Sequence, residues 1–268
     1  MDLTPVQYGL GALSGGLVGF TLGLFGGGGS ILAVPLMVYV VGVPNPHVAI
    51  GTSALAVAAN AFANLLGHSR FGHVKWRCAG LYSLAGVAGA FAGSSLGKRI
   101  GGEHLLFLFA LLMLVVGALM FRERGATGDP GAQCSRENAP KVLAFGGLTG
   151  LFSGFFGIGG GFLIVPGLIA ATGMPILFAI GSSLVAVTAF GLTTALNYAA
   201  SGLVDWTLAA LFAALPPLPA PPAGRAAAAS RPAPPRRLAA RKGLLNTVFA
   251  LMIVVVAAYM LFKSYGNL

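Results

Sequence analysis

Long apolar stretches, separated by glycine clusters and short polar turns, cover most of this 268-residue chain. They form two sets of five. The first set comprises 8–25, 30–43, 47–67, 77–97 and 103–121, and the second comprises 141–156, 161–173, 175–199, 207–223 and 244–262. The second stretch of each set is short, since a helix of about 14 residues rises about 21 Å against a hydrocarbon core of about 30 Å. We expect it to be a half-helix, a strongly tilted helix or one arm of a re-entrant hairpin.

The two sets repeat one another in sequence. Gly23–Gly29 followed by Pro35 reappears as Gly154–Gly161 followed by Pro166. Further matches join Gly42 and Pro44 to Gly173 and Pro175, Ala49–Ser53 to Ala179–Ser183, and Gly72, Val74 and Trp76 to Gly202, Val204 and Trp206. A duplicated apolar unit interrupted by glycine is typical of secondary transporters, in which paired broken helices form one site between two halves.

Composition places these stretches in a membrane. The chain is 56% hydrophobic and 8% charged, which predicts an all-α polytopic membrane protein with glycine-broken helices. We expect a first repeat at 1–121, a cytoplasmic linker at 122–140 and a second repeat at 141–268. The amino terminus lacks a basic region and a cleavage site, so we expect no removable signal peptide. The net charge of +10 is better explained by basic membrane loops than by nucleic-acid binding.

The distribution of basic residues predicts that the repeats are inverted. With an odd number of crossings in each half, 13 of the 16 basic residues fall on one side and three, Lys98, Arg99 and Lys263, on the other. With an even number the split is 8 to 8, which carries no orientation signal. The amino terminus should therefore lie outside and the linker inside. Lys75, on the inner side, is replaced by Asp205 at the matching outer position.

One segment departs from the repeat. Residues 216–242 hold eight of the 16 prolines and read as Pro/Ala/Arg low complexity where the fourth stretch of the second half should continue. Six of the 13 basic residues counted on the inner side come from this segment. A GC-rich coding segment read out of frame would produce such text, and the nucleotide sequence would decide between this hypothesis and a genuine segment.

The glycine runs are the first candidate site. A helix that starts after such a run has free backbone N–H groups and a partial positive charge at its amino end, which suits an anion. The candidate substrate-binding residues here are Gly26, Gly27, Gly28, Gly29, Ser30, Gly157, Gly159, Gly160 and Gly161. Pro35 and Pro166 are candidate hinges, or plain helix geometry. The alternative role of membrane glycines is close helix packing, which we favour for Gly86, Gly89 and Gly93.

Polar side chains in the apolar stretches are the second group of candidates. The hydroxyls of Thr52, Ser53, Ser182 and Ser183 follow a glycine at matching positions, and they could donate to an oxyanion or simply bond the preceding turn of their helix. The amides of Asn60, Asn64 and Asn197 lie at membrane depth, where an unpaired amide is costly.

Other chemistries find little support. All six carboxylates lie in termini, loops or segment edges, so no acidic relay for protons or sodium is expected within the membrane. The four histidines lie near segment ends and are expected to be interfacial. No metalloprotease, P-loop or nucleophile-elbow motif is present, so we expect no catalytic residue, metal or cofactor. Cys78 and Cys134 lack metal-ligand and CxxC spacing and are expected to be free thiols.

These motifs resemble the TauE/SafE family of sulfite and organosulfonate permeases. The resemblance rests on Gly19–Gly29 with Pro35, Gly150–Gly161 with Pro166, the Gly-Thr-Ser and Gly-Ser-Ser triplets, and the Gly-x-Val-x-Trp closings at 72–76 and 202–206. It implies a bacterial inner-membrane transporter, probably an exporter by the family's name, of sulfite, sulfoacetate, other sulfonates or related carboxylates. Protons are a candidate coupling ion. A passive anion channel and a non-transporting membrane scaffold or assembly factor are the alternatives.

Overall fold

The computed structural model describes residues 4–122, 134, 137–158, 161–214 and 250–263. Nearly all of them are helical, and this described part contains no strand. Five helical runs are long and apolar enough to cross a membrane. The all-α polytopic fold predicted from the sequence is therefore confirmed.

The helices follow the apolar stretches of the first half closely. Helix α1 ends at the first glycine run, which forms a short 3₁₀ helix and leads through one helical turn into a π-helical turn after Pro35. The elements of this half are α1 (Pro5–Phe25), η1 (Gly26–Leu32), α2 (Ala33–Pro35), η2 (Leu36–Val40), α3 (Pro46–Arg70), α4 (Trp76–Gly97) and α5 (Gly102–Arg122).

The second half begins with the same order of elements. They are α6 (Ala139–Phe156), α7 (Gly161–Thr172), α8 (Ile176–Ala199) and α9 (Trp206–Ala214), and an apolar helix covers Ala250–Lys263. The Pro/Ala/Arg-rich segment 216–242 lies outside the described residues, as do six of the basic residues used in the charge count.

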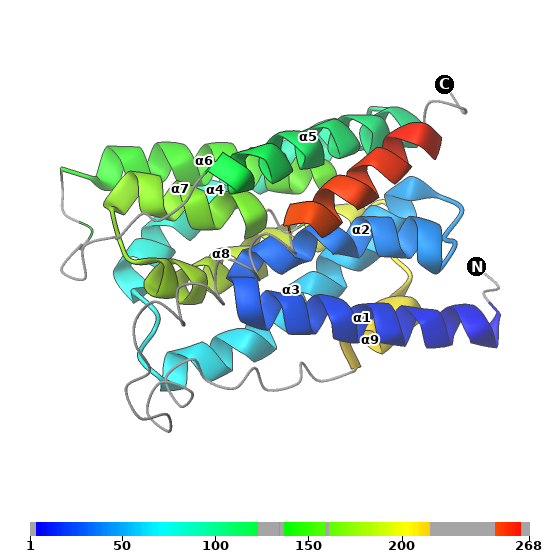
Figure 1. The fold of residues 1–268 in the computed structure, drawn as a ribbon, viewed down its shortest axis with the longest axis horizontal. Coiled ribbons are helices and arrows are strands. Elements are labelled where there is room, and N and C mark those ends of the chain that lie inside the picture. Colours follow the sequence, from blue (N-terminus) through cyan, green and yellow to red (C-terminus); the bar gives the residue numbers. More distant parts are fainter. Residues whose placement is uncertain (1–3, 123–133, 135–136, 159–160, 215–249, 264–268) are drawn as a thin grey trace.

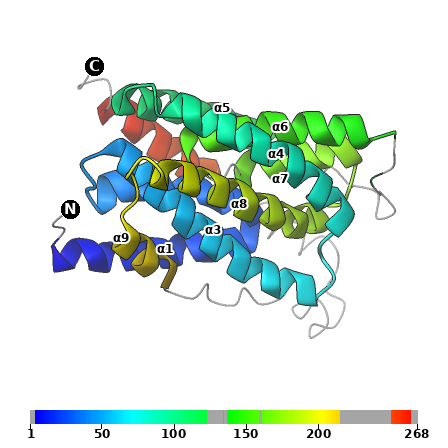
Figure 2. The ribbon, with the colours of Figure 1, turned by 180° about the vertical axis from the view of Figure 1, so that it is seen from behind.

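Each half opens with a re-entrant hairpin. Helix α1 runs toward the middle of the bundle, and residues 26–40 return to the end from which α1 started, as Figures 1 and 2 show. The Gln7 side-chain amide donates to the carbonyl of Val41 at 3.0 Å, which ties the two arms together. Helices α6 and α7 form the matching hairpin, and it opens toward the opposite end of the bundle. Of the alternatives for the short second stretch, the structure has the hairpin.

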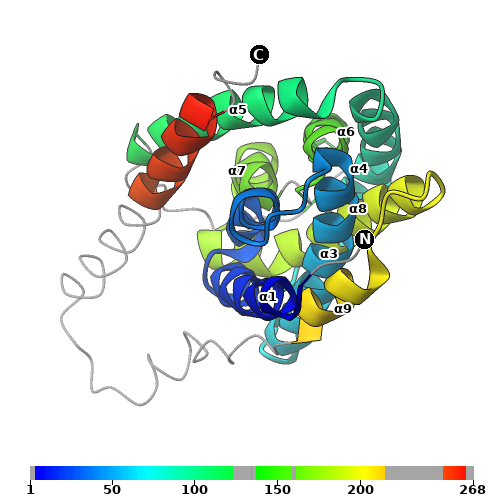
Figure 3. The ribbon, with the colours of Figure 1, turned by 90° about the vertical axis from the view of Figure 1, so that its right-hand side faces the viewer.

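The two ends of the bundle can be named by what lies there. The amino terminus and the end of the last helix share one end, called here the termini face, and the connection from α5 to α6 marks the other, called the linker face (Figure 1). Viewed along the bundle in Figure 3, α7 and the 26–40 segment lie near the centre, and α5 arches over them on one side. The hairpins thus meet inside the bundle.

Left-handed glycines mark matching turns in the two halves. Every glycine with positive φ among the described residues belongs to a repeat pair, which are Gly26 and Gly157, Gly42 and Gly173, and Gly72 and Gly202. Only glycine adopts this conformation without steric cost. The repeated glycines therefore reflect a repeated backbone path.

Small residues allow α4 and α6 to pack at backbone distance. A Cβ added at Gly89 would overlap the carbonyl of Gly147, and one added at Gly93 would overlap the carbonyl of Leu151. A Cβ added at Gly150 would in turn overlap the backbone of Gly86. Close approach of this kind is the usual role of small residues in membrane helices. The packing role predicted for Gly86, Gly89 and Gly93 is confirmed.

The prediction for the cysteines is wrong. Cys78, in the first turn of α4, forms a disulfide with Cys134, and their Cα atoms are 5.4 Å apart. Spacing along the chain gave no sign of the pair because 56 residues separate the two cysteines. The fold brings them together at the linker face.

Candidate functional site

The two glycine runs meet backbone to backbone in the bundle. A Cβ added at Gly161 would overlap the carbonyl of Gly27, and one added at Gly27 would overlap the backbone of Gly161. Gly26 to Gly29 are all buried. The tips of the opposed hairpins are therefore in direct contact, and neither position has room for a side chain. Gly159 and Gly160 lie outside the described residues.

Two serines complete this crossing. Ser183 Oγ accepts a hydrogen bond from the Gly27 N–H at 3.2 Å and donates to the carbonyl of Ile180 at 2.8 Å. Ser30 Oγ donates to the carbonyl of Gly27 at 2.8 Å. Both serines are fully buried. Helix α7 starts at Gly161, so its amino end, with the partial positive charge of a helix terminus, also lies at this crossing. The structure brings together Gly27, Gly161, Ser30 and Ser183 of the predicted site.

The remaining hydroxyl candidates are occupied by backbone contacts. Ser53 Oγ donates to the carbonyl of Ile50 at 3.0 Å, as Ser183 does to Ile180. Thr52 Oγ1 accepts from the Asp205 N–H and Ser182 Oγ accepts from the Lys75 N–H, both at 2.9 Å. Thr52 and Ser182 therefore each hold a loop of the other half.

Two of the asparagines lie together on α3. Asn64 Nδ2 donates to the carbonyl of Gly19 on α1 at 3.2 Å and to the carbonyl of Asn60 at 3.0 Å. Asn60 is buried, and its amide nitrogen has no hydrogen-bond partner among the described residues. A buried donor without a partner is costly, so Asn60 is the asparagine best placed to donate to a ligand.

Asn197 lies apart from the crossing. Its side-chain oxygen accepts from Lys98 Nζ at 2.9 Å, and its amide nitrogen donates to Ser94 Oγ at 2.6 Å and to Ser95 Oγ at 2.9 Å. Lys98 Nζ also donates to Ser201 Oγ at 2.9 Å. These contacts join the carboxyl ends of α4 and α8 at the termini face. The sequence pointed to Asn197 alone and missed this network, because its members are distant in the chain.

The two prolines sit at matching places in the returning arms of the hairpins. Pro35 ends the α2 turn and is followed by the π-helical turn η2, and Pro166 lies inside α7. A proline within a helix removes one backbone hydrogen bond and favours a kink. The irregular helix at Leu36–Val40 is consistent with such a local distortion.

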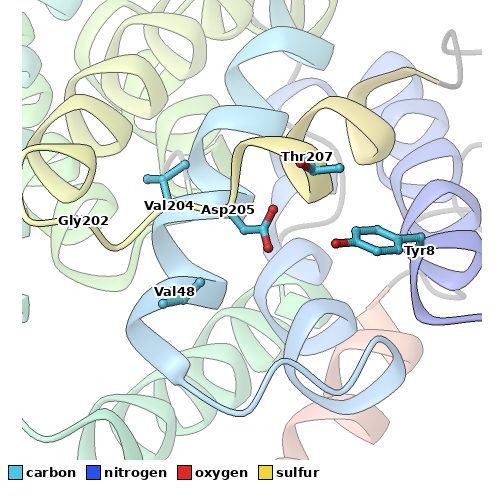
Figure 4. A pocket seen from close by; sticks show the side chains of 6 residues that line it. All are labelled: Tyr8, Val48, Gly202, Val204, Asp205 and Thr207. Atoms are coloured by element: carbon cyan, nitrogen blue, oxygen red, sulfur yellow. The ribbon is translucent and has the colours of Figure 1, made fainter. Parts of the chain in front are cut away.

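The cavities are at the termini face and not at the crossing. One, of about 340 Å³, is lined by Tyr8, Val48, Gly202, Val204, Asp205 and Thr207. In Figure 4 the hydroxyl of Tyr8 and the carboxylate of Asp205 face each other across it. A second, of about 190 Å³, lies beside Glu103 and Lys263. Neither is lined by a glycine-run residue, so the crossing is closed in this conformation.

Comparison with known proteins places this architecture in a family. The family model described as "Sulfite exporter TauE/SafE" matches residues 11–260. The chain belongs to this family. The match covers both hairpins and the crossing, and the chain is thus a multi-pass membrane protein of a transporter family.

Its relatives carry names of one kind. A "Probable membrane transporter protein" from Xylella fastidiosa strain 9a5c is 54% identical over 262 residues, covering 95% of each chain. A protein of the same name from strain Temecula1 is 53% identical, again with 95% of each chain covered. "Probable membrane transporter protein YunE" of Bacillus subtilis is 24% identical, covering 72% of this chain and 79% of the relative. No solved structure matches the chain.

The backbone contact at the crossing predicts a strong effect of the smallest substitution. Gly161→Ala should push the hairpin tips apart, at an overpacking cost of about 1–3 kcal/mol. We expect it to lower the unfolding temperature of the purified protein by several degrees. The control is Gly9→Ala on α1, where a Cβ would meet no atom within 4 Å. Equal unfolding temperatures for the two variants would contradict the contact.

Proposed function

We propose that this protein moves small sulfur-containing anions, such as sulfite, sulfoacetate or other organosulfonates, out of the cell across the inner membrane. The observation that carries the proposal is the meeting of the two glycine runs, with Ser183 and the amino end of α7 beside them. Backbone N–H groups at a helix start suit an oxyanion, and no acidic side chain lies among the residues named at the crossing. The family description supports the choice of substrate.

The substrate would bind where the hairpin tips touch. In the closed conformation the Gly27 N–H donates to Ser183 Oγ. An entering anion would accept from that N–H in place of the serine oxygen, and the hydroxyl would rotate to donate as well. Asn60 Nδ2, buried and without a partner among the described residues, would supply a further donor. The bound anion would thus exchange its water for fixed donors.

We further infer that the halves are inverted copies that rock against each other. The support is the opposite direction of the two hairpins and the pairing of equivalent contacts between the halves (Figure 2). Rocking of inverted repeats about a central site is a general way to achieve alternating access. Protons are the candidate coupling ion.

The linker face would be cytoplasmic, with the amino terminus outside. Arg70, Lys75 and Arg77 lie at the linker face, and cytoplasmic loops accumulate such residues. The Cys78–Cys134 bond lies at the same face. Because the cytoplasm keeps most thiols reduced, this bond would form only on oxidation in a cell with this orientation.

The site assignment predicts that the two matched serines act together in transport. We expect Ser53→Ala with Ser183→Ala to lower sulfite flux into proteoliposomes by about tenfold, the equivalent of one lost buried hydrogen bond. The matched control is Ser69→Ala, whose Oγ only donates to its own helix at the carbonyl of Leu66. Unchanged flux in the double variant would show that these serines do not bind the substrate. Absence of flux in the native protein, across sulfite, sulfonates and carboxylates, would refute the proposed function.

The orientation can be tested with one cysteine at each face. In a background of Cys78→Ser and Cys134→Ser, the exposed Arg70 and Arg99 are each replaced by cysteine. A membrane-impermeant maleimide added to intact cells should label Arg99→Cys and leave Arg70→Cys unlabelled until the cells are opened. The reverse pattern would place the linker face outside.

A further inference from the structure

The loops that follow α3 and α8 are fastened in the same way at opposite faces. At the linker face the Lys75 N–H donates to Ser182 Oγ, and at the termini face the Asp205 N–H donates to Thr52 Oγ1, both at 2.9 Å. Each acceptor is a fully buried hydroxyl on the third long helix of the other half. Each loop is therefore held across the boundary between the halves.

Glycines let both loops lie directly on those helices. A Cβ added at Gly51 would overlap the carbonyl of Leu203, and one added at Gly181 would overlap the carbonyl of His73. The two contacts are equivalent, since the repeat relates each residue of one to a residue of the other. The backbone around each loop is thus built to one plan, and any difference between the faces comes from side chains.

The side chains at equivalent positions differ in size and in charge. At the termini face, Val48 and Asp205 line the cavity of about 340 Å³ (Figure 4). The repeat places Phe178 where Val48 stands and Lys75 where Asp205 stands. At the linker face Lys75 Nζ lies 5.1 Å from the centre of the Phe178 ring, and the His73 ring meets that ring edge-on at 6.5 Å. Phe178 thus takes the space that is a cavity at the other face.

The charges have opposite effects on an anion. A mouth with protein walls focuses the field of the charges that line it and changes the local concentration of ions of opposite sign. Lys75 is joined at the linker face by Arg77, which is exposed and equivalent to Thr207 of the cavity. An anion would be concentrated at the linker face and repelled by the carboxylate of Asp205 at the termini face.

We infer that these two loops are the mouths of the anion path, with unequal affinities: Lys75 and Arg77 make the linker face the capturing side, and Asp205 makes the termini face the releasing side. The inference rests on the proposed anion transport and adds residues that set its sidedness. Since the gradients alone fix the end point of transport, a lower KM at the linker face is matched by a lower maximal rate from that face. The asymmetry tunes rates at working concentrations.

The test measures the KM for sulfite separately from each face, in right-side-out and inside-out membrane vesicles. Lys75→Gln should raise the KM at the linker face about fivefold and leave the KM at the termini face unchanged. Lys75→Arg, which keeps the charge, should restore the native value. Lys141→Gln is the matched control, because Lys141 is an exposed lysine at the same face but on α6.

The second variant, Asp205→Asn, should lower the KM at the termini face by a similar factor. It keeps the oxygen that accepts from the Leu208 N–H at 2.9 Å and so preserves the start of α9. KM values that stay unchanged, or that move equally at both faces, would overturn the inference while leaving anion transport intact. Loss of flux in the native protein for every anion tested would overturn the proposed function and the inference with it.

Discussion

The architecture depends on one steric constraint, the contact of Gly27 with Gly161. Opposed hairpins can meet inside the bundle only if their tips carry no side chains, since either Cβ would overlap backbone of the other hairpin. Backbone at such a turn has N–H groups that the helices cannot satisfy, and within a membrane they need a partner inside the protein. Ser183 supplies one partner in the closed conformation. The same requirement that closes the crossing would let it accept an anion.

Contacts between the halves follow from this arrangement. Each half places a hydroxyl, Thr52 or Ser182, under a loop of the other half, and each loop needs a glycine beneath it. Motion of one half relative to the other must therefore break or shift these bonds. By contrast, α4 and α6 are packed at backbone distance along several turns and are expected to move together. The molecule combines a tightly packed pair of helices with a crossing held by few polar contacts.

Much of the fold could be predicted from sequence because its causes are local. Apolar stretches and glycine turns gave the helices to within a few residues, and the repeat marked Gly27, Gly161 and Ser183 as candidates. The contacts between the halves could not be predicted, since one sequence cannot show that Thr52 accepts from Asp205 or that Asn197 meets Lys98. The disulfide was missed for the same reason. The replacement of Val48 by Phe178 was visible in the repeat, but its meaning needed the cavity.

The most direct test of the account is to locate the bound anion. Selenite, a heavier analogue of sulfite, can be found by anomalous scattering in crystals of the protein grown in lipid. The account predicts a selenium peak at the crossing, within hydrogen-bonding reach of the Gly27 N–H and Ser183 Oγ. A peak found only elsewhere, such as beside Lys98 or in the cavity next to Asp205, would contradict it.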